Sequence, residues 1–314
     1  MTSESEQKKV RISAIVCVYN REATLAQCLE ALGNQTLDDA AFEVIVVDNN
    51  STDRSPEIAA EFAKAHGNIR VVLETKQGLA AARNRGMAEA LSPIAAFTDD
   101  DAIPAADWLE RLLARFDTLN EEIVAVGGEI EPVWEGGKPD WLEGDMLNHA
   151  VSVSLGWSRR ARELKDTEFL IEANSAYRIA PVVERGGFPE DLGRIGTNLL
   201  SGENAVNSVL ARDGYRFFFD PEIRVKHQIA KSRLTKEWFR RRFFWQGVTT
   251  FFVNQYLREK GCDVELSTEV QLPMNEASWV NVFDAEAGGD FIENLRALYG
   301  MGYVLAASKV LMGR

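Results

Sequence analysis

The segment IAAFTDDD, Ile94–Asp101, joins an apolar run with the length of a buried strand to three consecutive aspartates. Apolar runs that end in polar residues also occur at residues 12–20 and 43–49. Both faces of these runs are apolar, as the strands of a buried parallel sheet require. The segments therefore predict an α/β fold in which several strands end at one polar edge, where such sheets bind ligands.

Apolar runs alternate with segments of helical periodicity from residue 11 to about residue 130. The expected strands are Ile12–Val18, Glu43–Val47, Ile69–Leu73, Ile94–Thr98 and Val124–Ile130. The intervening segments place apolar residues three and four apart, which predicts helices at Thr24–Leu32, Pro56–Ala65, Leu79–Leu91 and Ala105–Leu119. This alternation predicts a Rossmann-like, mostly parallel sheet flanked by helices.

The composition excludes several classes of protein. A formal net charge of −13 disfavours nucleic-acid binding, because affinity for the phosphate backbone depends on clustered Lys and Arg. Three widely spaced cysteines form neither a disulfide framework nor a zinc motif, and they fit a reducing cytoplasm. Residues 1–9 lack the apolar core of a signal peptide, and no stretch reaches the roughly 18 apolar residues of a membrane span. A cytoplasmic location is expected.

Three adjacent carboxylates at Asp99, Asp100 and Asp101 repel one another unless a cation is close. Oxygen ligands suit Mg²⁺ or Mn²⁺, which bind through one or two carboxylates together with substrate phosphates. The alternative is a solvated acidic turn that caps a helix. The position of the three residues at the carboxyl end of a strand favours the metal site.

An ordered set of motifs follows the same course along the chain as in family 2 inverting glycosyltransferases of the GT-A fold, which this sequence resembles over about residues 11–230. The motifs are residues 18–20 (VYN), 46–53 (VVDNNSTD), 78–86 (GLAAARNRG), 99–101 (DDD), 172–178 (EANSAYR), 201–204 (SGEN) and His227. The resemblance implies transfer from a nucleoside-diphosphate sugar, with a UDP-sugar favoured, to a hydroxyl of a glycan or lipid-linked acceptor. Cell-envelope polysaccharide or glycolipid assembly is the expected setting.

The resemblance also implies which residues form the site. The donor-binding residues are expected to be Tyr19, Asn20, Asp48, Arg83, Asp99 and Asp100. The metal, Mg²⁺ or Mn²⁺, is assigned to Asp101 and His227, and the acceptor side to Asn174 and Trp134. Two of these assignments have plain structural alternatives. A lone histidine is more often structural than a ligand, and the residues around Asp48 also favour a tight turn.

The resemblance divides the chain into four expected parts. Residues 1–10 form a disordered lead-in, and residues 11–130 form the α/β half that binds the nucleotide sugar. Residues 131–230 form the acceptor-binding and catalytic half of the same domain, and residues 231–314 form a mainly helical C-terminal extension. The segment Arg224–Trp245, which spans the boundary between the last two parts, is rich in basic and aromatic residues. The segment is expected to reach the inner face of a membrane, unless it is a helix whose aromatic residues pack on the core.

The pair Glu203-Asn204 stands where the family has Glu-Asp. An amide cannot take a proton at neutral pH, so Glu203 is the expected base that deprotonates the acceptor hydroxyl. The alternative role for Glu203 is that of an acidic residue in the first turn of a helix, where the helix dipole favours it.

Other nucleotide-binding classes lack their required motifs. The residues after the first expected strand, Tyr19-Asn20-Arg21-Glu22, contain no glycine, which disfavours a dinucleotide-binding dehydrogenase and a nucleotidyltransferase. No phosphate-binding loop ending in Gly-Lys-Ser/Thr is present. A non-catalytic protein that binds a nucleotide sugar on the same fold stays open, because the Glu-Asn pair departs from the family.

Replacement of Glu203 by glutamine tests its role as the base. Glu203→Gln keeps the shape of the side chain but removes its proton affinity, so we expect kcat to fall by about 10²-fold or more with donor binding near normal. Asn204→Asp is expected to be unnecessary for activity. Steady-state transfer assays on both variants decide the matter: near-normal Glu203→Gln with a strongly activated Asn204→Asp would place the base at the second position.

Overall fold

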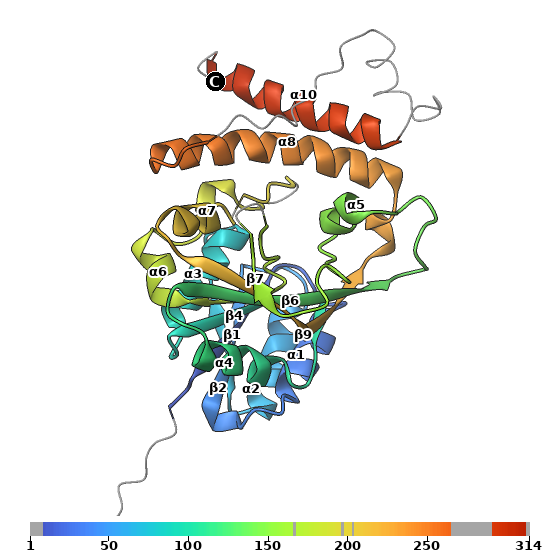
Figure 1. The fold of residues 1–314 in the computed structure, drawn as a ribbon. Helices are drawn as coiled ribbons and strands as arrows, with labels where there is room; N and C mark the ends of the chain where they lie inside the picture. Colours follow the sequence, from blue (N-terminus) through green and yellow to red (C-terminus); the bar gives the residue numbers. More distant parts are fainter. Residues whose placement is uncertain (1–8, 166–167, 196–197, 203, 265–290, 312–314) are drawn as a thin grey trace, which may run out of the picture.

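The structure, a computed structural model, describes residues 9–165, 168–195, 198–202, 204–264 and 291–311 (Figure 1). The strands are β1 (Ile12–Val18), β2 (Phe42–Asp48), β3 (Ile69–Leu73), β4 (Ile94–Asp99), β5 (Ala102–Pro104), β6 (Ile123–Trp134), β7 (Arg162–Glu163), β8 (Asn174–Arg178) and β9 (Arg216–Ile229). The helices are α1 (Leu25–Gly33), α2 (Ser55–Ala65), α3 (Leu79–Glu89), α4 (Trp108–Thr118), α5 (Asp145–Ala150), α6 (Ile179–Glu184), α7 (Ala205–Arg212), α8 (Lys236–Glu259) and α10 (Phe291–Leu311). Short 3₁₀ turns lie at Asp39–Ala41, Glu190–Leu192 and Lys231–Arg233.

The strands form one mixed sheet in the order β3-β2-β1-β4-β8-β6-β9-β5, with β7 paired to β9. The first four strands are parallel, which confirms the predicted alternation of strands and helices. The fifth expected strand is longer than predicted and does not lie next to β4. Instead β8 lies between β4 and β6 and runs antiparallel to both. The sheet is mostly parallel in its first half and mixed in its second.

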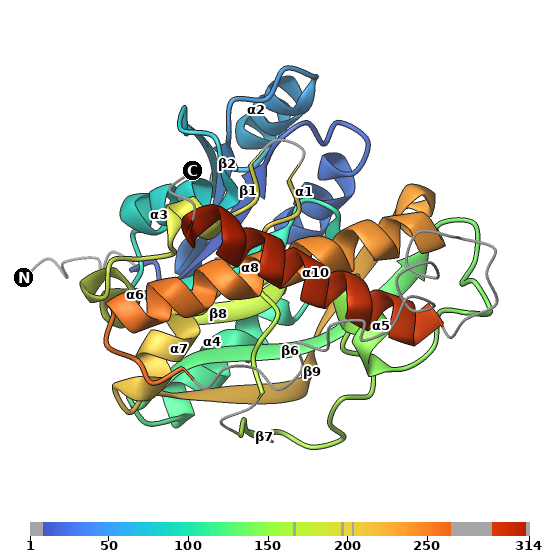
Figure 2. The ribbon, with the colours of Figure 1, turned by 90° about the horizontal axis from the view of Figure 1, so that it is seen from above.

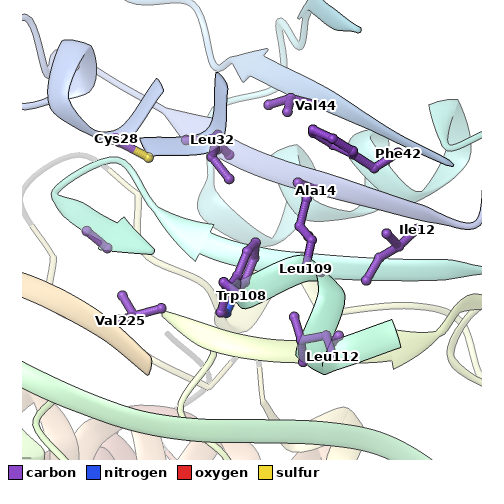
Figure 3. Packing of buried hydrophobic residues seen from close by; sticks show 14 of the residues in the cluster. Ile12, Ala14, Cys28, Leu32, Phe42, Val44, Trp108, Leu109, Leu112 and Val225 are labelled. Carbon is purple, nitrogen blue, oxygen red and sulfur yellow. The ribbon is translucent and has the colours of Figure 1, made fainter. Parts of the chain in front are cut away.

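Alternate side chains of each central strand enter separate apolar clusters on the two faces of the sheet. On β1, Ile12, Ala14, Val16 and Val18 face the cluster formed with α1, α2 and α4, whereas Ile15 faces the cluster formed with α3, α6 and α7. Figure 3 shows the first cluster, where residues of α4 lie beside β1 and β9. Because both faces are covered by helices, ligands can reach the sheet only at its edges.

The C-terminal helices form an extra layer above the carboxyl ends of the parallel strands. Helix α8 lies over this edge of the sheet, and α10 crosses over α8 on the outer side (Figures 1 and 2). A third apolar cluster, which includes Leu147 of α5, Phe239 of α8 and Leu295 of α10, ties the layer to the end of β9. The predicted helical extension is therefore packed onto the sheet. Within the described ranges, no helix has the length and hydropathy of a membrane span.

Two glycines allow α8 and α10 to touch through their backbones. A Cβ atom at Gly247 would overlap the carbonyl oxygen of Tyr299, and one at Gly302 would overlap the carbonyl oxygen of Phe244. Close backbone contact of this kind leaves no room for any side chain at the crossing point.

Alanine at Gly247 gives a test in which two effects oppose each other. Alanine favours helix formation by about 1 kcal/mol over glycine, but the added methyl group must push the helices apart. We expect Gly247→Ala to lower the free energy of unfolding by about 1–3 kcal/mol in urea titrations. The control is Gly67→Ala, where a Cβ meets nothing within 4 Å. A Gly247→Ala protein more stable than wild type would contradict the described crossing.

Candidate active site

A cavity of about 1020 Å³ is lined by residues at the carboxyl ends of the parallel strands and by residues of helices α8 and α10. The sheet register brings these strand ends together, because Cys17 pairs with Asp99 and Val18 pairs with Asp48. The lining includes Tyr19, Arg83 and all three aspartates of residues 99–101 on the sheet side. The predicted polar edge of the sheet is thus the floor of the cavity.

The floor holds three side chains of the kinds that bind metal ions. One ligand atom from each of Asp99, Asp101 and His227 lies within 4.8 Å of the others. Nε2 of His227 is 3.1 Å from Oδ1 of Asp101, and Nδ1 is 3.1 Å from the carbonyl oxygen of Val151. A carbonyl only accepts, so Nδ1 carries a proton and donates it to Val151, and Nε2 is the ring nitrogen that faces the carboxylate. Two electron-pair donors placed this way suit a shared cation.

Strand pairing explains how His227 reaches the aspartates. The short strand β5 runs antiparallel to β9, and Ala102 is the register partner of His227. The backbone N–H of Gln228 also donates to the carbonyl of Asp101 over 2.9 Å. His227 is 1% exposed, so its ring is fixed between the sheet and Val151.

The pKa values of Asp100 and Asp101 are shifted in opposite directions, although an arginine lies beside each carboxylate. Nε of Arg21 is 3.0 Å from Asp100, and Nη2 of Arg233 is 3.4 Å from Asp101. Burial, with the neighbouring aspartate charges, raises the pKa of Asp100 in spite of Arg21. Burial would also raise the pKa of Asp101, but the hydrogen bond and charge of His227 and the arginine charges outweigh it and lower that pKa. The lowered pKa keeps Asp101 ionised, as a metal ligand must be.

Arg83 lies on the cavity floor between two aromatic rings. Its guanidinium is 5.9 Å from the ring centre of Phe97 and 5.6 Å from that of Phe188, and Nη2 is 3.9 Å from Asp99. The side chain is only 4% exposed. The two aromatic rings and the nearby carboxylate hold this cation at the cavity floor.

The other expected nucleotide-binding residues lie in two linked loops above the floor. Oδ1 of Asp48 accepts from the N–H of Ser51 over 3.1 Å, and Oδ1 of Asn20 accepts from the N–H of Thr52 over 2.8 Å. The tight-turn alternative for Asp48 therefore describes one of its contacts. Among the described residues, the cavity lining includes Tyr19 and Asn49 but neither Asn20 nor Asp48. The side chain of Asn20 thus links the β1–α1 and β2–α2 loops, whereas that of Asp48 stabilises the turn that follows β2.

Asn49 is a site residue that the motifs did not single out. Its Nδ2 donates to the carbonyls of Glu74 and Lys76, and its Oδ1 accepts from the N–H of Gly78 over 2.8 Å. Gly78 has φ of 139°, a conformation that favours glycine, and it lines the cavity. Asn49 thus shapes the wall before α3, and only its place in the DNNS segment hinted at this role.

Asn174 and Trp134, expected on the acceptor side, are not among the described residues that line the cavity. Asn174 is 1% exposed, its Oδ1 accepts from the indole N–H of Trp108, and its Nδ2 donates to the carbonyls of Glu129 and Ile223. Trp134 ends β6 and packs against the third apolar cluster. Both residues have contacts that explain them as parts of the core, and their place at the acceptor stays a prediction.

The segment Arg224–Trp245 is divided among three elements instead of forming one surface. It includes the end of β9, the 3₁₀ turn Lys231–Arg233 and the start of α8. Phe239 is fully buried and Trp238 packs beside it, as the core-packing alternative predicted. The exposed residues of the segment are mainly basic, as at Arg224 and Lys226.

Glu203, the expected base, lies outside the described residues. Its neighbours on either side are described: Ser201 and Asn204 line the cavity, and Asn204 directly precedes α7. Two other lining residues, Arg21 and Arg242, were missed because arginines on loops and helices carry no motif of their own.

The sequence profile of the family described as Glycosyl transferase family 2 matches residues 13–168. Over 242 residues, the chain is 25% identical to the glucosyl-dolichyl phosphate glucuronosyltransferase of Haloferax volcanii, a match that covers 76% of this chain and 75% of that protein. It is 37% identical over 127 residues to the glycosyltransferase AglE of the same organism, but this match covers 40% of this chain and 41% of AglE.

Solved structures share the fold over nearly the whole chain. The mannosyltransferase PcManGT of Pyrobaculum calidifontis, in complex with GDP-Man and Mn²⁺, superposes with a TM-score of 0.61 at 21% identity, covering 98% of this chain and 88% of that one. TarS 1-349 of S. aureus with UDP-GlcNAc superposes with a TM-score of 0.54 at 17% identity, covering 97% and 93%. The sheet and its C-terminal helices are therefore of the GT-A type.

Substitution of Asn174 separates a structural role from an acceptor role. Asn174→Ala leaves the indole of Trp108 and two buried carbonyls without partners, so we expect the free energy of unfolding to fall by about 2–4 kcal/mol. The KM for acceptor should not change. Chemical denaturation and transfer kinetics provide both measurements, with exposed Asn34→Ala as the control. A raised acceptor KM with unchanged stability would return Asn174 to the acceptor site.

Proposed function

The chain belongs to glycosyltransferase family 2 and is an enzyme that transfers sugar from a nucleotide sugar; from this premise we propose its specific reaction. The donor is a nucleoside-diphosphate sugar, with UDP as the carrier, and the acceptor is a hydroxyl of a glycan or lipid-linked molecule. Transfer inverts the anomeric configuration. Because the chain is an enzyme, the alternative of a non-catalytic protein that binds a nucleotide sugar is rejected.

The group of Asp99, Asp101 and His227 is the observation that supports this proposal most directly. Its atoms suit a divalent cation, and the N–H of His227 toward Val151 fixes the tautomer that a metal ligand needs. An imidazole in the group favours Mn²⁺ over Mg²⁺, which prefers oxygen ligands alone. Bound at these residues, the ion supplies positive charge that stabilises the departing diphosphate.

The remaining floor residues prepare the site for an anionic donor. Arg83 adds a fixed cation beside Asp99, and Arg21 compensates the buried Asp100. The wall held by Asn49 brings the backbone of Gly78 to the cavity surface, where a ligand can approach closely. We assign the nucleoside to the side of Tyr19 and Asn49, whose loop is braced by Asp48 and Asn20.

Inversion requires a direct displacement by the acceptor. The acceptor oxygen forms the new bond to the anomeric carbon, the bond from that carbon to the diphosphate breaks, and the hydroxyl proton passes to a base. We propose Glu203 as this base, because Asn204, its neighbour at the cavity, carries an amide that cannot accept the proton. We also propose that exposed basic residues such as Arg224, Lys226 and Lys236 contact an anionic membrane surface.

Removal of the metal or of its ligand tests the proposal. We expect a chelator to abolish transfer, and Asp101→Asn to lower kcat by about 10²-fold or more. Mn²⁺ with UDP at about 100 times the dissociation constant should stabilise the wild type by about 2.7 kcal/mol, and this gain should disappear in Asp101→Asn. Transfer assays and thermal unfolding measure the two effects.

Asp107→Asn is the matched control, since Asp107 pairs with Arg111 on α4 and does not line the cavity. Full activity in excess chelator would contradict the metal assignment and leave residues 99–101 as a charged turn. Testing GDP and UDP separately identifies the carrier nucleotide.

A further inference from the structure

Arginine is concentrated at the cavity in a chain that is acidic as a whole. The chain has 48 acidic and 35 basic residues, but the described lining holds six arginines and four carboxylates. Three of these arginines, Arg21, Arg83 and Arg233, lie within 4.0 Å of residues 99–101. The other three, Arg194, Arg242 and Arg296, come from other parts of the wall, so the positive charge extends beyond the donor floor.

Helices α8 and α10 each contribute one of these arginines. Arg242 of α8 donates to the carbonyl of Leu199 over 2.8 Å and to Oγ of Ser201 over 3.1 Å. Arg296 of α10 is exposed and lines the cavity, and within the described part of the chain no hydrogen bond or ion pair engages its guanidinium. A cation held at a cavity without a protein counter-ion points to an anionic ligand.

The position of Arg296 is fixed by contacts on both sides of it. Nε of Arg240 donates to Oδ1 of Asn294 over 3.0 Å, and the hydroxyl of Tyr299 donates to Oγ1 of Thr250 over 2.9 Å. Leu295 is fully buried in the third apolar cluster. Because α10 is anchored before and after Arg296, the backbone of this residue is held where its side chain lines the cavity.

The same side of the cavity has an apolar wall. Met146 and Ala150 of α5 and Phe243 of α8 line the cavity and also pack against the third apolar cluster. Phe169 lines the cavity with 49% of its surface exposed. An apolar wall next to arginines suits a ligand that carries both an apolar chain and an anionic group.

Resting on the proposed function, we propose that the α8–α10 side of the cavity binds an acceptor in which a phosphate is joined to an apolar chain. The phosphate lies at Arg296 and Arg242, whose planar guanidinium groups match phosphate oxygens. The chain lies along Met146, Phe169 and Phe243. A neutral glycan acceptor lacks an anionic group that would pair with these cations, and free phosphate lacks an apolar chain that would pack on the apolar wall.

The test uses octyl phosphate below its micelle concentration, titrated calorimetrically into the full chain. Saturating Mn²⁺ and UDP occupy the donor side first. Inorganic phosphate and octyl glucoside are the two comparison ligands, one without the chain and one without the charge. We expect octyl phosphate to bind at least about tenfold more tightly than either, and Arg296→Gln to weaken it about tenfold. Arg159→Gln, the same change at an exposed residue away from the lining, should have no effect.

Each contrary result has a distinct meaning. Unchanged binding by Arg296→Gln would overturn the proposal, as would octyl phosphate binding no tighter than inorganic phosphate or octyl glucoside. The first comparison would indicate a site for free phosphate, and the second would indicate a neutral lipid. Failure of the proposed donor function shows separately, as absence of UDP binding with Mn²⁺ in the titration that precedes the octyl phosphate.

Discussion

The pairing of β5 with β9 is the constraint on which the site depends. β5 is only three residues long, but its antiparallel register sets His227 opposite Ala102, directly after the aspartates. This register brings together Asp101 and His227, two candidate metal-binding side chains that are 126 positions apart in the sequence. A slip of one residue would turn His227 to the other face of the sheet, because side chains alternate along a strand. The group of Asp99, Asp101 and His227 therefore forms only when β5 and β9 pair in this register.

Charge compensation then determines how such a floor can exist inside a folded protein. Asp100 and Asp101 are nearly buried, and an unpaired buried charge is costly. Arg21, Arg233 and His227 balance part of this charge, which leaves Asp101 ionised and Asp99 partly exposed toward the cavity. The floor is therefore stable as folded, while it keeps carboxylate oxygens available for a cation.

The sequence predicted the features that depend on local pattern. The four parallel strands, their polar ends and residues 99–101 follow from apolar periodicity, and His227 followed from the ordered motifs. The position of β8 between β4 and β6 could not be predicted, because antiparallel insertion depends on long-range pairing and leaves no local signal. The core contacts of the Asn174 amide with Trp108, Glu129 and Ile223 also depend on long-range pairing, so the sequence did not indicate them. Glu203, assigned from its motif, stays a prediction.

The floor of the cavity and its opposite side, the roof formed by α8 and α10, come from different parts of the chain. The floor lies largely within residues 13–168, the part that the family profile matches, and its carboxylates and Arg83 are charged groups that suit a divalent cation and an anionic ligand. The roof comes from α8 and α10, which lie outside that match. Gly247 and Gly302 let the backbones of these helices touch, so α10 is fixed against α8 and its Arg296 lines the cavity. Under the proposed function α8 and α10 contact the acceptor and the floor holds the donor, so substitutions in these helices can alter acceptor binding without changing the floor, because the two share a cavity but few structural elements.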